Sequence, residues 1–119
     1  MKTAAYPIFV LEKDDYSFRE VASPKDLNWY EWPDIVEGLY EGWDSFGRHF
    51  VLAWNFAMRT PEVILEEQPD VAAFKQAVTE YAERYGRLIS KPRGYCDPDA
   101  LKQKVDEIEK RIDPNHRDG

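Results

Sequence analysis

Residues 35–54 read IVEGLYEGWDSFGRHFVLAW, and this stretch decides the fold. Two aromatic-rich arms, 35–43 and 48–54, flank a polar turn at 44–47. The turn ends in Gly47, which can adopt the positive φ that a hairpin connection of this length needs. In the second arm the largest apolar side chains fall at alternate positions and share one face: Phe50, Leu52 and Trp54. The stretch predicts an antiparallel hairpin.

Two more strands and a short helix are expected before this hairpin. Residues 6–12 form an apolar run that is too short for a helix, and a polar turn separates them from residues 16–21. Together these two runs predict a second hairpin. Ser23 followed by Pro24 is typical of a helix start. Pro33 disfavours helical geometry at the residue before it, so the predicted helix covers only residues 24–31.

The pattern changes on the other side of the central hairpin. Residues 62–67 predict one further strand, and the apolar spacing after Asp70 then changes from two residues to three or four. Two helices are expected from this spacing, one ending at Gly86 and one running from 97–99 to 113–114. Their apolar stripes are Val71, Phe74, Val78, Tyr81 and Tyr85 in the first, and Leu101, Val105, Ile108 and Ile112 in the second.

This order of elements predicts an α+β fold. Strands linked by hairpins indicate an antiparallel sheet of four or five strands, with a short inserted helix and two C-terminal helices packed on one face. The length of 119 residues suits a single domain, which we expect to span residues 1–114. Residues 115–119 are expected to form a frayed tail.

Charge and composition exclude several classes of function. The net charge is −7, and residues 31–70 carry nine acidic and two basic side chains. Such a field repels phosphate backbones and attracts cationic partners, so we expect no nucleic-acid binding. No run approaches the roughly 18 apolar residues of a membrane span. A single cysteine, Cys96, and an N-terminus without signal-peptide features predict a cytoplasmic protein.

The sequence offers little for catalysis or for metal binding. His49, His116 and Cys96 show no ligand spacing, and the glycines match no phosphate-binding or dinucleotide-binding motif. Cys96 lacks a nearby histidine in the sequence to act as its base. Asp44 and His49 flank one turn, and an exposed contact across the strands is the simpler explanation for that pair. We therefore expect no catalytic residue, no metal and no cofactor.

Aromatic and acidic side chains concentrate between residues 29 and 54. All four tryptophans lie there, and Arg48 is the lone Lys or Arg residue in this range. Exposed rings among acids are typical of a surface that binds a basic protein. The residues predicted to bind the partner are Trp29, Trp32, Asp34, Glu37, Tyr40, Glu41, Trp43 and Asp44. The whole surface is expected within residues 29–70.

The runs YPIFVLEKDDYSF and EGLYEGWDSFGRHFVL resemble small uncharacterised bacterial proteins, some of which are similar to immunity proteins of toxin systems. The resemblance covers about the first half of the chain. It implies a compact acidic protein that inhibits a partner toxin.

Two other interpretations compete with a binding protein of this type. A structural or homo-oligomeric domain, such as a homodimer, would use the exposed rings as a self-interface. A small-ligand carrier or an enzyme would instead need polar groups that converge in a pocket between sheet and helices.

Overall fold

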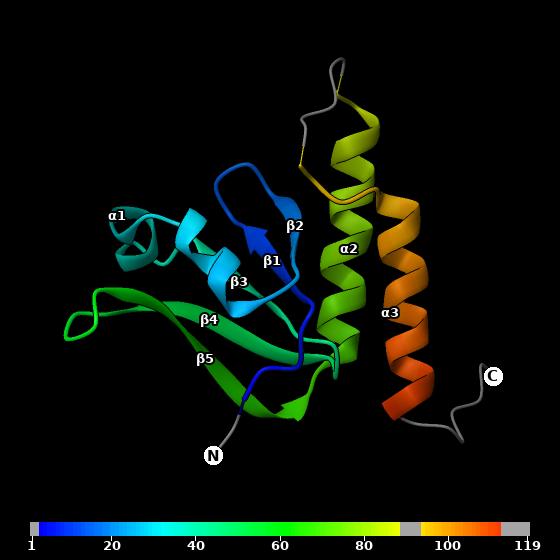
Figure 1. Cartoon of the computed structure of the whole chain (residues 1–119). Coiled ribbons are helices and arrows are strands. Elements are labelled where there is room, and N and C mark those ends of the chain that lie inside the picture. The colour runs from blue at the N-terminus through cyan, green and yellow to red at the C-terminus, as the bar shows by residue number, and fades with distance from the viewer. Residues whose placement is uncertain (1–2, 89–93, 113–119) are drawn as a thin grey trace.

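The computed structural model describes residues 3–88 and 94–112 (Figure 1). All neighbouring strands of its five-stranded sheet are antiparallel, in the order β2-β1-β3-β4-β5. The strands are β1 (Ile8–Glu12), β2 (Ser17–Val21), β3 (Tyr40–Trp43), β4 (Arg48–Asn55) and β5 (Thr60–Pro69). The helices are the 3₁₀ helix η1 (Pro24–Trp29), α1 (Trp32–Val36), α2 (Val71–Gly86) and α3 (Pro98–Ile112). The predicted α+β fold with an antiparallel sheet is confirmed.

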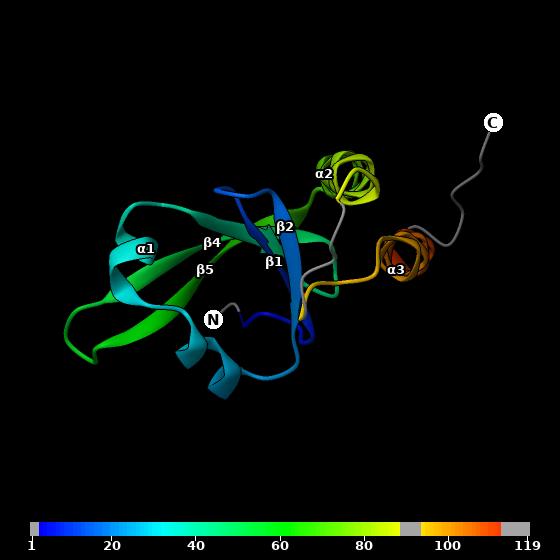
Figure 2. The same cartoon turned by 90° about the horizontal axis from the view of Figure 1, so that it is seen from above.

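The sheet has a core on each face. On one face, β1, β2 and β3 contribute Phe9, Phe18 and Trp43 to a core covered by α2 and α3. On the other face, strand residues such as Val10 and Phe50 pack with Leu27 of η1 and Ile35 of α1. Figures 1 and 2 show the two long helices side by side, with α1 at the far end of the sheet. The two C-terminal helices thus share one face, and the short helices lie on the other.

The two C-terminal helices form as their apolar spacing predicts. The Asp70 carboxylate accepts a hydrogen bond from the Ala73 N–H at 3.2 Å and caps α2. The stripe of α2 faces the core, where Phe74 and Tyr81 are buried and Tyr85 is half-buried. In α3 the buried side chains are Leu101, Val105 and Ile108, together with Pro98 at the helix start. The predicted stop at 113–114 and the predicted tail at 115–119 lie outside the described residues.

The central hairpin forms, but its first arm is shorter than predicted. Gly47 has a φ of +74° in the connection between β3 and β4, as the turn requires. The predicted strand at 35–43 is wrong over its first half, because Ile35 and Val36 belong to helix α1. Pro33 occupies the first turn of that helix. Backbone N–H groups there have no acceptor within the helix, so the missing N–H of proline costs no hydrogen bond. Proline therefore begins a helix here.

The predicted helix at 24–31 is a shorter 3₁₀ helix, η1, that ends at Trp29. Ser23 does not cap it through a backbone N–H. Its hydroxyl donates instead to the carboxylate of Asp26 at 3.2 Å. Leu27 is the buried residue of η1 and fixes this segment to the sheet.

The last strand is longer than predicted. The strand expected at 62–67 extends over Thr60–Pro69 and pairs with β4 along most of its length. The β4–β5 hairpin extends away from α2 and α3, and its tip is formed by residues 56–59 (Figure 1). On the face toward those helices, the facing pair Val51 and Ile64 remains exposed. β5 forms one open edge of the sheet.

Among the described residues, no helix has the combination of length and apolar character that crossing a membrane requires.

Candidate functional site

The eight predicted partner-binding residues do not share one surface. Tyr40 is 4% exposed and lies in the core beneath the short helices, while Trp43 is 3% exposed and lies in the core beneath α2. Trp43 stacks on Phe74 with 5.0 Å between the ring centroids. The expectation that Trp43 belongs to an exposed binding surface is wrong, since α2 covers that end of β3. Tyr40 and Trp43 therefore form no part of the contact surface proposed below.

Asp44 is fully buried and organises the turn. Its carboxylate accepts hydrogen bonds from the N–H groups of Phe46 at 2.9 Å and Arg48 at 3.0 Å, and from the N–H of Ala5 at 3.1 Å. The Arg48 guanidinium completes the shell through Nε at 3.1 Å and Nη2 at 2.8 Å. A buried carboxylate that accepts five hydrogen bonds is a structural anchor for the hairpin.

Three of the predicted residues, Trp32, Asp34 and Glu37, lie on or beside α1, at the end of the sheet away from the long helices. Trp32 is 53% exposed on α1, where Val36 is exposed too. Glu31 and Glu37 flank these apolar side chains and are exposed, and Asp34 is half-buried. Burial, with smaller contributions from Glu12 and Asp34, raises the pKa of the neighbouring Tyr40 phenol to about 12. The acids and Trp32 thus lie on or directly beside a single short helix.

The tip of the β4–β5 hairpin adds apolar side chains to the same end. Phe56 is 71% exposed and Met58 is 70% exposed. Helix α1 contacts both β4 and β5, and both views show it beside this hairpin (Figures 1 and 2). We define the end surface as Glu31, Trp32, Asp34, Val36, Glu37, Phe56 and Met58. Phe56 and Met58 were not singled out from the sequence, because nothing in the sequence distinguishes an exposed Phe or Met at a hairpin tip from an apolar residue of a buried strand.

A second accessible feature is an acidic groove between β3, β4 and α2. It has a volume of about 380 Å³, and Glu41 and His49 lie among its lining residues. The two ring nitrogens of His49 lie 3.3 Å from the carboxylate of Glu41 and 3.2 Å from that of Glu66. The conjectured contact between Asp44 and His49 is replaced by these pairs and by the pairing of Asp44 with Arg48. Glu41 is therefore half-buried in an internal network.

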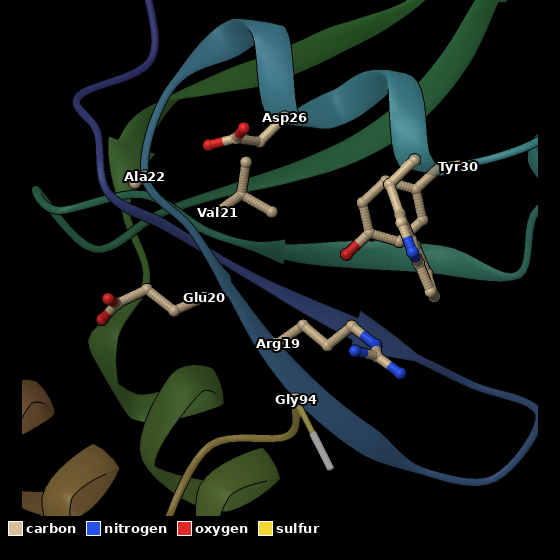
Figure 3. A pocket seen from close by; sticks show the side chains of 8 residues that line it. Arg19, Glu20, Val21, Ala22, Asp26, Tyr30 and Gly94 are labelled. Carbon is tan, nitrogen blue, oxygen red and sulfur yellow. The ribbon is translucent and has the colours of Figure 1, made fainter.

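A third feature is a pocket around Arg19, which sequence analysis did not single out (Figure 3). It has a volume of about 280 Å³. The Arg19 guanidinium carbon lies 4.4 Å from the ring centroid of Trp29 and 4.2 Å from that of Tyr95. The remaining lining residues come from β2, η1 and the segment at residue 94: Glu20, Val21, Ala22, Asp26, Tyr30 and Gly94. We call this the Arg19 pocket.

The described residues offer little for nucleophilic catalysis or metal binding. Burial, with a smaller contribution from Glu20, raises the pKa of the Cys96 thiol to about 12. Cys96 therefore carries almost no thiolate at neutral pH and is a poor nucleophile. Within residues 3–88 and 94–112, no group of three His, Cys, Asp or Glu side chains could hold a metal ion.

The chain matches no protein-family model, no curated protein and no solved structure. The geometry of the three features therefore carries the functional argument.

Proposed function

We propose that this chain is a non-enzymatic binding protein that docks a basic protein partner through the end surface. One observation carries the proposal: Trp32 is 53% exposed in a five-residue helix whose neighbouring positions hold three acids. Exposed tryptophans are costly to leave in water and are enriched among the residues that dominate protein interfaces. Trp29, which lies against Arg19, is assigned to the Arg19 pocket below.

The charge of the surrounding segment selects the kind of partner. Residues 31–70 carry nine acidic and two basic side chains, and the three acids of the end surface belong to this segment. Their field attracts a cationic protein over distances up to about a Debye length, roughly 8 Å at physiological salt. The acids should therefore govern the association rate, and the apolar residues should govern how long the complex survives.

The resemblance to immunity proteins supports a finer version of this proposal, in which the partner is a toxin that the chain inhibits. An adjacent reading frame for a basic toxin domain would supply the protein to use in binding experiments. Absence of such a neighbour would leave affinity capture from the native cell extract as the way to obtain the partner.

The first experiment compares Trp32→Ala with Phe46→Ala. Phe46 is a matched control because it is also an exposed aromatic residue, but it lies in the turn between β3 and β4, away from α1. We expect Trp32→Ala to raise the dissociation rate by about 30-fold, the equivalent of about 2 kcal/mol, and Phe46→Ala to leave it near the wild-type value. Both variants should melt near the wild-type temperature.

The second experiment neutralises charge without changing shape. The triple amide variant at Glu31, Asp34 and Glu37 should associate more slowly and with less dependence on salt. Its control is a triple amide variant at the exposed acids Glu83, Asp99 and Glu107 of the long helices, which has the same net charge. Equal association rates for the two triple variants would show that net charge, and not the end surface, attracts the partner. A partner found to be a second copy docked through the long helices would overturn the proposal.

A further inference from the structure

We propose that the Arg19 pocket binds the carboxylate of a ligand that also carries a positive charge. Two sources share this chemistry: the carboxyl end of a basic peptide, and a free basic amino acid. The site lies on β2 and η1, outside the end surface, so the inference does not depend on the proposed partner.

Arg19 has hydrogen-bonding capacity that the fold does not use. It makes no hydrogen bond or ion pair with any described residue, whereas Arg48 pairs with Asp44 and Arg84 pairs with Glu80. Its Nε atom is buried without a hydrogen-bond acceptor. A guanidinium presents its N–H groups in a planar fork that matches the two oxygens of a carboxylate. Because Nε is enclosed, the Nη nitrogens, which are not among the buried unpartnered atoms, form the free edge suited to a bidentate contact.

The guanidinium is held in place by groups that leave this edge free. The Trp29 and Tyr95 rings contact it through cation–π interactions, which do not consume N–H groups. Tyr95 is itself fixed by a hydrogen bond from its hydroxyl to the Asp15 carboxylate at 2.8 Å. Next to it, the Cys96 N–H donates to the Phe18 carbonyl of β2 at 2.9 Å. The rings thus orient Arg19 before any ligand arrives, which lowers the entropic cost of binding.

Gly94 shows how closely the chain approaches the guanidinium. A Cβ atom at this position would lie 2.5 Å from an Arg19 Nη atom, and the backbone φ of +84° also favours glycine. Figure 3 shows Arg19 extending between this glycine and the end of η1 near Tyr30. The absence of a side chain at position 94 therefore keeps the arginine in its observed position.

The other charge in the pocket selects a ligand of mixed charge. Asp26 lines the same pocket, and Figure 3 shows its carboxylate near Ala22, away from the guanidinium, whereas the Glu20 side chain leaves β2 on the other side of the strand. Together with the net charge of −7, Asp26 disfavours a phosphate dianion. A ligand with a carboxylate and a cation can satisfy Arg19 and Asp26 together. The volume of about 280 Å³ lies near the lower end of small-molecule sites and suits a group the size of one or two amino acids.

The test is an NMR titration of the wild-type protein that follows the Arg19 Nε–H and the Trp29 indole N–H. The probes are an N-acetylated lysine-alanine-lysine tripeptide with a free carboxyl end, the same peptide with an amidated end, free lysine and inorganic phosphate. We expect saturable shifts of both signals with the free-acid peptide, at a dissociation constant on the order of 1 mM. The amidated peptide should bind at least about tenfold more weakly, because a charge-assisted contact is lost.

The other probes distinguish the two possible sources of the ligand and show which results would contradict a carboxylate site. Free lysine that binds as well as the free-acid peptide would identify a free amino acid as the ligand, and much weaker binding would identify a chain end. Equal binding of acid and amide, binding of phosphate at least as tight, or no saturable shift would each overturn the proposal. These outcomes need no protein partner, so they are separate from failure of the end surface.

Variants test the role of Arg19 directly. Arg19→Lys keeps the charge but removes the fork, and it should abolish the preference for the acid over the amide. Arg87→Lys, at an exposed arginine, is the matched control and should behave as wild type. Tyr95→Phe keeps the ring and should retain binding. A preference for the acid that survives in folded Arg19→Lys would contradict the assignment, and the titration of the wild type stays decisive if this variant does not fold.

Discussion

At the scale of single residues, Asp44 illustrates how a charged side chain is tolerated in a fully buried position. Its carboxylate accepts two hydrogen bonds from N–H groups of its own turn, one from the N–H of Ala5 and two from the Arg48 guanidinium. Burial of an ion is unfavourable unless its lone pairs are satisfied and an opposite charge is near. Both conditions are met, so the acid stabilises the chain reversal that joins β3 to β4.

Replacing Asp44 by alanine should therefore be strongly destabilising. Asp44→Ala leaves the Arg48 charge and several N–H groups without their acceptor, and we expect a loss of about 3 kcal/mol in the free energy of unfolding. Urea denaturation measures it. Asp14→Ala, at an exposed acid in the preceding turn, is the control and should change stability by less than about 0.5 kcal/mol. Equal losses for the two variants would contradict the anchoring role.

Cys96 gives a prediction about reactivity. Burial raises its pKa to about 12, from an ordinary value near 9. At pH 8 the thiolate fraction should be about 1,000-fold lower in the folded protein than in the unfolded chain. Ellman's reagent should accordingly label the native protein far more slowly than the protein in urea. Comparable labelling rates in the two conditions would show that the thiol is accessible and ionises normally.

Individual site residues were the part of the molecule that sequence predicted least well. Trp43 lies beside a turn, and its burial depends on Phe74, which is distant in the chain and belongs to helix α2. Arg19 contacts Trp29 across the loop that follows β2, and it contacts Tyr95, which is distant in the chain. No local spacing carries such information. By contrast, Trp32 and Glu37 were predicted as surface residues, and both are exposed.

At the scale of elements, helix α2 packs against the sheet and closes one of the two cores. Phe74 is fully buried, stacks on Trp43 and lies 5.7 Å from the Phe9 ring and 6.1 Å from the Phe18 ring, measured between centroids. One side chain of α2 thus contacts three strands. Aromatic pairs of this kind add stability beyond the area that they bury.

Phe74→Ala should cost about 3–5 kcal/mol in the free energy of unfolding, as truncation of a buried ring usually does. Gln76→Ala, at an exposed position of the same helix, controls for helix propensity and should be nearly neutral. Chemical denaturation of both variants provides the measurement. A thermal and chemical stability of Phe74→Ala close to that of wild type would mean that α2 does not pack on the sheet as described.

Elements with strong local signals were predicted correctly, and those without them were not. The α2 and α3 stripes and the turn at Gly47 appear in the structure as the spacing indicates. The strand at 62–67 was predicted, but its length was underestimated because the tip of the β4–β5 hairpin contains no glycine to mark the turn: Asn55 accepts a hydrogen bond from the Met58 N–H, and Arg59 adopts a φ of +55°. Pairing along most of β4 compensates for that unfavourable turn.

At the scale of the whole molecule, the tyrosines make stability sensitive to alkaline pH. Burial is the main cause that raises the pKa values of Tyr16 and Tyr40 to about 12, and it raises those of Tyr30 and Tyr81 further. An ordinary tyrosine ionises near pH 10. The folded state therefore retains protons that the unfolded state releases at high pH.

This difference has a definite sign. The stability contributed by these groups is fully present below about pH 9 and is lost as the pH rises through 10 to 12, since the unfolded chain then ionises more readily. Urea midpoints should be flat from about pH 7 to 9 and should fall steeply above pH 10. Tyr81→Phe should make that fall shallower. A midpoint that stays constant to pH 12 would show that the phenols are not desolvated.

The position of β5 at an open edge of the sheet has a further consequence for behaviour at high concentration. A ten-residue edge strand offers a row of unpaired backbone groups on which strands from other molecules can add. Pro61 and Pro69 remove two donors from this row, and Glu62, Glu66 and Glu67 place like charges along it. Two such edges repel each other. Part of the acidity of the segment thus opposes the addition of further strands at this edge, the step by which edge strands polymerise into fibrils.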